Sequence, residues 1–153
     1  MRIALAADHA GFKLKEIVKE HLSKGGHDVA DLGAHSEERC DYPGFARGVA
    51  AKVSGGFADF GVLVCGSGIG MCMAANRVQG IRAAVIRDLF DAEMSRKHND
   101  ANVACLGGRV TESSEALGLL DIFLSTPFEG GRHEARVRQI DEALVGGSHE
   151  FER

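Results

Sequence analysis

The sequence predicts an α/β protein with a three-layer Rossmann-like (flavodoxin-like) fold, in which a parallel five-stranded sheet carries helices on both faces. Three observations predict this class. Short apolar runs alternate along the chain with longer segments in which apolar residues recur every three or four positions. Several of the short runs are apolar throughout, which is typical of strands covered on both faces. Single helical segments separate the runs, which favours right-handed βαβ units and hence parallel strands.

The apolar runs are the predicted strands, and they span residues 3–7, 29–32, 61–65, 81–86 and 102–106. The helical pattern is clearest in two segments, whose apolar positions are Leu14, Ile17, Val18 and Leu22 in the first and Phe45, Ala46, Val49, Ala50 and Val53 in the second. A Gly-Gly pair ends each of these helices, as is common at helix C-termini. Further helices are predicted at about 69–78, 89–98, 112–124 and 131–145. The length of 153 residues favours one domain, placed at residues 1–145, and the polar residues 146–153 are expected to form a mobile tail.

Composition excludes several classes of function. The formal net charge is −4, and the basic residues are dispersed except near the C-terminus, unlike the footprint of a nucleic-acid-binding protein. No apolar run approaches the ~18 residues that span a bilayer, and no long apolar region follows a basic N-terminal segment. We therefore expect a cytoplasmic protein that binds neither nucleic acid nor a membrane.

The four cysteines, Cys40, Cys65, Cys72 and Cys105, are predicted to be reduced thiols. None belongs to a CxxC motif, and a chain of this length does not need disulfides to hold its core. Neither their spacing nor that of the seven histidines gives a zinc motif, so no metal is implied.

The loop after the third predicted strand is the most informative stretch of the chain. Cys65 ends the apolar run, and glycine then occupies every second position, at Gly66, Gly68 and Gly70. Such a loop exposes backbone N–H groups, and the helix predicted beyond it favours an oxyanion and lowers the pKa of a neighbouring thiol. A reactive thiolate beside an anion is therefore predicted. The alternative is a buried structural cysteine at a tight turn.

Ligands of open parallel sheets bind at the carboxyl ends of the strands. Three groups are predicted there, because Asp8-His9 follows the first strand, the Cys65 loop follows the third and Arg109 follows the fifth. Two polar clusters lie elsewhere. The segment 98–102 precedes the last strand, where the alternative to a functional role is an ordinary helix C-cap.

The second cluster contains Arg132 and Arg136, one helical turn apart, where like charges repel by about 0.2 to 0.5 kcal/mol. A bound anion would relieve that repulsion. The alternative is a solvated surface on which Glu129 or Glu134 pairs with the arginines.

Six motifs occur together over residues 1 to about 145: Asp8-His9-Ala10-Gly11-Phe12, Asp41-Tyr42-Pro43, Cys65-Gly66-Ser67-Gly68-Ile69-Gly70, Gly80-Ile81-Arg82-Ala83, His98-Asn99-Asp100-Ala101-Asn102-Val103 and Phe128-Glu129-Gly130-Gly131-Arg132-His133. Their joint occurrence in this order resembles the type B ribose-5-phosphate isomerases, a family that includes galactose-6-phosphate and allose-6-phosphate isomerases. The resemblance implies a metal-independent, cofactor-free aldose–ketose isomerisation of a phosphorylated sugar through a cis-enediolate, with ribose 5-phosphate and ribulose 5-phosphate as the first expectation.

The resemblance also implies roles for individual residues. Cys65 would move the proton between C1 and C2, and His98 would open the furanose ring. The enediolate oxygens would be held by the Ser67 hydroxyl and by the amides of Gly66, Ser67, Gly68, Ile69 and Gly70. Sugar hydroxyls would bind Asp8, His9, Tyr42 and Asn99. The phosphate would be held by His9, Arg109, Arg132 and Arg136.

Two departures within the family sharpen these expectations. One branch uses a glutamate base at the position of Met71 and has no cysteine at position 65, and Met71 cannot abstract a proton. The Gly130-Gly131-Arg132-His133 segment is not retained in this form in the two-subunit galactose-6-phosphate isomerases. We therefore expect a cysteine base and a homodimer, with a tetramer as the alternative, in which the neighbouring subunit completes each site.

Other interpretations stay open. Gly66, Gly68 and the strand before them match part of the GxGxxG dinucleotide fingerprint, with Asp88 near its acidic position, but the third glycine falls at Met71. A catalytically silent phosphosugar-binding module is another alternative. Within the isomerases, allose 6-phosphate, galactose 6-phosphate and erythrulose 4-phosphate type substrates share the reacting end and the phosphate, and differ in the span between them.

Overall fold

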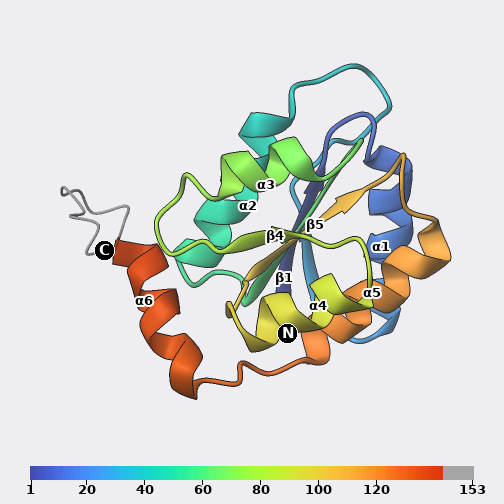
Figure 1. Ribbon diagram of the computed structural model, residues 1–153. Helices are drawn as coiled ribbons and strands as arrows, with labels where there is room; N and C mark the ends of the chain where they lie inside the picture. The colour runs from blue at the N-terminus through green and yellow to red at the C-terminus, as the bar shows by residue number, and fades with distance from the viewer. Residues whose placement is uncertain (143–153) are drawn as a thin grey trace.

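Five strands form the central layer of the fold (Figure 1). The structure is a computed structural model, and it describes residues 1–142. The strands are β1 (Arg2–Ala7), β2 (Asp28–Asp31), β3 (Phe60–Cys65), β4 (Ala83–Val85) and β5 (Val103–Gly107). They lie in the order β2-β1-β3-β5-β4, and all neighbours are parallel. The predicted fold class is confirmed.

Helices cover both faces of the sheet, as Figure 1 shows. They are α1 (Phe12–Lys24), α2 (Tyr42–Ser54), α3 (Ile69–Ala75), α4 (Leu89–Lys97), α5 (Ser113–Ser125) and α6 (Glu134–Glu142), with a 3₁₀ turn η1 (Gly131–His133) before the last. Successive side chains of β1 alternate between the two layers, so Ile3 and Leu5 pack under α1, α4 and α5, whereas Ala4 and Ala6 pack under α2 and α3. Burial on both faces explains why these strands are apolar throughout. Within residues 1–142, none of the helices has the length and apolar character needed to cross a bilayer.

Two predicted elements are shorter in the structure. β4 keeps only three residues of the predicted 81–86, as the short edge strand of the sheet. The helix predicted over 69–78 ends at Ala75, because the Asn76 side chain instead bonds the β4 backbone: its Nδ2 donates to Ala83 O (2.9 Å), and its Oδ1 accepts from Ala83 N–H (2.7 Å). The predicted tail, 146–153, lies outside the described residues, as does the predicted helix end at 145.

The order of the strands fixes where a ligand can bind. The chain leaves β1 for β2 on one side and later returns to β3 on the other, so β1 and β3 flank the point where the winding reverses. In open α/β sheets the crevice at this point, outside the carboxyl ends of the strands, is the usual binding site.

Candidate active site

The carboxyl ends of β1, β3 and β5 bring together most of the residues predicted at that edge. Ala7 pairs with Val64 and Cys65 pairs with Gly107, so the three strands end side by side. Their following loops enclose a cavity of about 640 Å³. It is lined by Asp8, Tyr42, Cys65, Gly66, Ser67, Ile69, Gly70, Met73, Arg109 and Val110.

Cys65 ends β3 at the floor of this cavity, and its side chain is almost fully buried. The backbone N–H of Gly68 donates to Cys65 Sγ at 3.1 Å. Gly68 adopts a positive φ of 77°, a conformation that strains other residues, and a Cβ there would lie 3.2 Å from Cys105 O. A backbone donor aimed at sulfur interacts more strongly with a thiolate than with a thiol. Glycine at position 68 therefore allows the turn that aims this donor at the thiol.

The next turn of the loop shapes the mouth of the cavity. Ser67 Oγ accepts from the Ile69 N–H at 3.4 Å. Gly70 lies against the Tyr42 ring so closely that a Cβ at position 70 would come 2.7 Å from the phenol carbon Cζ. The absence of a side chain at Gly70 thus allows Tyr42, from the start of α2, to stand over the loop.

Asp8 and Arg109 complete this wall. Asp8 Oδ1 accepts from the N–H groups of Ala10 (2.9 Å) and Gly11 (3.0 Å), so local turns fix its buried carboxylate. Arg109 is tied to the Cys65 loop, because its N–H donates to Gly66 O at 3.1 Å. The cavity therefore combines a thiol, a carboxylate, hydroxyls and a guanidinium, and all of these groups except the Tyr42 hydroxyl lie on short loops that follow strands.

The predicted His9 follows Asp8 but lies beside another loop. Its Nδ1 is 3.1 Å from Cys40 O and 3.3 Å from Cys40 N, which ties the segment before α2 to the end of β1. Its predicted contact with sugar or phosphate stays a prediction.

Four predicted residues, His98, Asn99, Arg132 and Arg136, lie at the opposite, amino-terminal edge of the sheet. His98 follows α4 and precedes β5. Asn102, just before β5, accepts at its carbonyl from Gly61 N–H (2.9 Å) near the start of β3. Four strand residues separate Gly61 from Cys65, which is about 13 Å along the sheet. One chain therefore does not bring these four residues to the Cys65 cavity.

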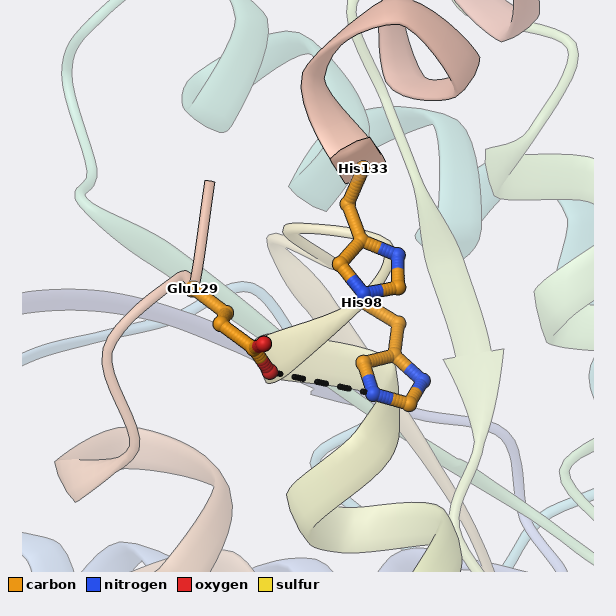
Figure 2. A group of neighbouring side chains, drawn as sticks. All are labelled: His98, Glu129 and His133. Atoms are coloured by element: carbon orange, nitrogen blue, oxygen red, sulfur yellow. Dashed lines mark ion pairs between the residues drawn. The ribbon is translucent and has the colours of Figure 1, made fainter. Parts of the chain in front are cut away.

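Figure 2 shows the cluster around His98. The His98 and His133 rings stack with centroids 4.2 Å apart and planes 10° from parallel. Glu129 Oε2 lies 3.9 Å from His98 Nε2, and the Glu129 N–H donates to Lys97 O at 3.0 Å, which holds Glu129 beside His98. Arg132 Nε donates to His133 Nε2 at 3.3 Å, so this ring nitrogen acts as an acceptor.

Charge around this cluster favours an anion. Burial first, and then the nearby His98 and Arg132, lower the pKa of His133, which favours its neutral form. Among the described residues, His98, Glu129 and His133 form the one group whose donor types suit a metal ion, with ligand atoms within 4.8 Å of one another. Arg132 nevertheless bonds one of the two His133 ring nitrogens, Nε2. Positive charge from Arg132 and Arg136 further opposes a cation and suits a phosphate.

Comparison with known proteins identifies the family. The family model described as Ribose/Galactose Isomerase matches residues 3–140. This chain belongs to that family. It is 45% identical over 139 residues to the ribose-5-phosphate isomerase B of Escherichia coli (strain K12), covering 91% of this chain and 93% of the relative.

Solved structures of the family agree in fold. A ribose 5-phosphate isomerase from Thermotoga maritima superposes with a TM-score of 0.91 at 50% identity, over 92% of this chain and 97% of that one. A ribose-5-phosphate isomerase B from Mycoplasma genitalium, solved with bound ribulose-5-phosphate, has a TM-score of 0.91 at 42% identity, over 95% of this chain and 97% of that one. The predicted family is confirmed.

The sequence did not predict some residues that line the Cys65 cavity or flank the His98 cluster. Met73 and Val110 line the cavity with exposed apolar side chains, and Glu129 and His133 flank His98 and Arg132. Val110 is 71% exposed. The signal for His133 was its place in the Gly-Gly-Arg-His segment. For the others, no local pattern separates a cavity wall from an ordinary helix or loop position.

Proposed function

We propose that the protein interconverts ribose 5-phosphate and ribulose 5-phosphate, with Cys65 as the base. The observation that carries this proposal is the Gly68 N–H bonded to Cys65 Sγ in a cavity that Asp8, Ser67 and Arg109 also line. Membership of the ribose/galactose isomerase family supports it, as does the ribulose-5-phosphate bound to the relative from Mycoplasma genitalium. No cofactor is required for the steps below.

The proposed reaction is a proton transfer on the open-chain sugar. The Cys65 thiolate removes the C2 proton of ribose 5-phosphate, leaving a cis-enediolate, and returns that proton to C1 while the O2 proton passes to O1. Negative charge develops on the enediolate oxygens, where the Ser67 hydroxyl and the amides of residues 66, 67 and 70 donate hydrogen bonds. The Gly68 and Ile69 amides, predicted to do the same, instead donate to Cys65 Sγ and Ser67 Oγ. Met71 has no group that can take up the proton, and its side chain is fully buried in the core, so we assign the proton transfer to Cys65.

The remaining roles are proposed for the opposite edge of a second copy. His98 opens the furanose ring and Asn99 binds a hydroxyl, while Arg132 and Arg136 hold the phosphate together with His9 and Arg109 of the first copy. A twofold homodimer that joins the amino edge of one subunit to the carboxyl edge of the other forms two such sites. The exposed apolar rim of the cavity supports a dimer in which the second subunit covers this rim, since the Met73 and Val110 side chains are each about two-thirds exposed or more.

The proposed site also limits the kind of substrate. The substrate is a small phosphorylated sugar, whose length is set by the span between Cys65 and the arginines across the two subunits. Six-carbon allose or galactose 6-phosphate and four-carbon erythrulose 4-phosphate types are the alternative substrates. We place residues 1–145 in one domain and the protein in the cytoplasm.

Exchange of the C2 proton with solvent tests the central step. We expect Cys65→Ala to abolish this exchange and to lower kcat by about 10³-fold or more, because alanine cannot accept the C2 proton that Cys65 is proposed to remove. The variant should still bind sugar phosphate, which calorimetry measures. Near-native exchange would remove Cys65 as the base.

A turnover panel of four-, five- and six-carbon aldose and ketose phosphates tests the substrate. The largest kcat/KM is expected for ribose 5-phosphate. Binding without turnover across the panel would instead favour a silent phosphosugar-binding module, and retention of a nicotinamide cofactor would favour the dinucleotide-binding alternative.

A further inference from the structure

Helix α6 stands beyond the β4 edge of the sheet (Figure 1). Arg132 and Arg136 lie on η1 and α6, and the element that packs most closely on α6 is η1 itself. Within α6, Val137 is the buried residue. Because this helix has so little apolar contact, polar contacts must contribute much of what fixes its place beside His98.

The Arg82 guanidinium supplies those contacts. It is only 14% exposed, and all three of its nitrogens are used. Nε donates to the carbonyls of Asn99 (3.1 Å) and Asp100 (3.0 Å), and Nη2 donates to Asp100 Oδ2 (2.9 Å). Nη1 donates to both carboxylate oxygens of Asp141 on α6, at 3.2 and 2.9 Å. One side chain thus joins the loop after His98 to α6.

The loop side of this connection is anchored in the core. Asp100 Oδ1 accepts from Arg96 Nη1 at 2.7 Å, so the Asp100 carboxylate bridges two arginines. The Arg96 guanidinium in turn lies over the Phe60 and Phe123 rings, 5.0 and 5.9 Å from their centroids. These bonds hold Asp100 at a φ of 46°, where a residue other than glycine is uncommon.

The charges therefore alternate from the core to the outer helix, through Arg96, Asp100, Arg82 and Asp141. We infer that Arg82 is a positioning residue, which sets the place of the phosphate-binding face of α6 relative to the His98 loop. This inference rests on the proposed function for its effect on catalysis. Arg82 has two sets of contacts, or arms: one to the loop after His98 and one to Asp141 on α6. Neither arm leaves a guanidinium nitrogen for the substrate, because Asp100, Asp141 and backbone carbonyls occupy them.

The two arms of Arg82 predict different kinetic effects. Asp141→Asn loosens only the α6 arm, so KM for ribose 5-phosphate should rise about tenfold while kcat stays within about twofold. Arg82→Met loosens both arms, so KM should rise similarly and kcat should also fall by about tenfold to a hundredfold, because a displaced His98 opens the ring poorly. Asp141→Glu keeps the carboxylate and should restore most of the lost KM.

A matched control separates positioning from general loss of stability. Asp59 also pairs its carboxylate with an arginine, Arg2, at 2.5 Å, away from α6. Asp59→Asn should lower the melting temperature and leave KM unchanged. An Asp141→Asn variant with wild-type KM would overturn the inference, and so would equal increases in KM in the two variants.

Calorimetric titration with inorganic phosphate makes the test independent of turnover. Asp141→Asn should weaken phosphate binding about tenfold relative to the wild type and to Asp59→Asn. Equal affinities would overturn the positioning role. If the wild type turns over no sugar phosphate, the proposed function fails while this titration still decides the role of Arg82. Asp141→Asn carries the test alone if Arg82→Met does not fold.

Discussion

The two edges of the sheet hold their functional groups by different means. At the carboxyl edge the main chain holds the side chains in place. Backbone N–H groups no more than three residues away along the chain donate to Cys65 Sγ and Asp8 Oδ1. At the amino edge, side chains hold side chains over long separations, and Arg82 and Asp141 are 59 residues apart. The first arrangement follows from local conformation, whereas the second exists only once the tertiary structure has formed.

This difference matches the two roles that we propose for the edges, proton transfer at the carboxyl edge and phosphate binding at the amino edge. Proton transfer at carbon requires a base placed within a fraction of an ångström, and short loops on buried strands provide that rigidity. Binding a phosphate tolerates more movement, since charge acts over longer distances than bond-making. The two edges also face away from each other, so a single chain carries two halves of what we propose is one site.

Mixing two inactive variants is the strongest test of whether the two edges combine across subunits into one site. Cys65→Ala disables the carboxyl edge and His98→Asn the amino edge, so each homodimer should lose nearly all activity. In a mixed dimer one site collects both lesions and the other is intact, because a twofold dimer pairs opposite edges. Refolding an equal mixture should therefore recover about a quarter of wild-type activity, half of the dimers having one intact site.

Turnover of ribose 5-phosphate measures the recovery, and wild-type protein taken through the same refolding is the control. If the mixture stays as inactive as the separate variants, the edges do not share sites.

Gly70→Ala is the sharper test of the carboxyl edge. The added Cβ would lie 2.7 Å from the Tyr42 ring, and the half-exposed ring can swing away. KM should rise about tenfold with little loss of stability, because a displaced positioning group costs binding more than folding. Gly44→Ala is the matched control, since a Cβ there meets no atom within 4 Å. Steady-state kinetics on both variants give the answer, and an unchanged KM for Gly70→Ala would show that the Tyr42 position is unimportant.

The smallest expected effect concerns His133 at the amino edge. Burial and neighbouring cations lower its pKa, so the unfolded chain binds the proton more readily than the folded one. The contribution to stability is complete above the ordinary histidine pKa, near 6.5, and is lost as the pH falls from there toward the lowered folded value. The unfolding free energy should therefore decrease from pH 7.5 to pH 5.5, and His133→Asn should flatten that dependence.

Urea denaturation across this pH range measures the slope. His27→Asn is the control for histidine content, because His27 lies in the turn before β2, outside the amino-edge cluster. A slope in His133→Asn equal to that of the wild type would assign the pH dependence to other groups.

The carboxyl edge and the fold could be predicted because their causes are local in sequence. Apolar runs give strands, glycine pairs give helix ends, and the loops after parallel strands meet by topology, which places Asp8, Cys65 and Arg109 together. Where a prediction was wrong, the cause was a contact between residues that are separated in the sequence. Asn76 ends α3 early by binding Ala83, a contact that the helical pattern does not encode.

The sequence shows which residues of the amino edge are functional candidates, but it does not show how they come together in space. His98 and the two arginines stand out by type and by family motif, yet the placement of η1 and α6 beside the His98 loop depends on contacts between segments far apart in the sequence. Arg82 lies within a recognised motif, and its function depends on Asp141 and Asp100, whose approach is decided by the fold.

Tyr42 gives this protein a built-in optical probe. The chain contains one tyrosine and no tryptophan. Under excitation that phenylalanine does not absorb, its fluorescence therefore originates from the phenol that stands over Gly70 at the mouth of the Cys65 cavity. Ligand entry can be followed there without a label, and the amino edge contributes no emission of its own to the signal.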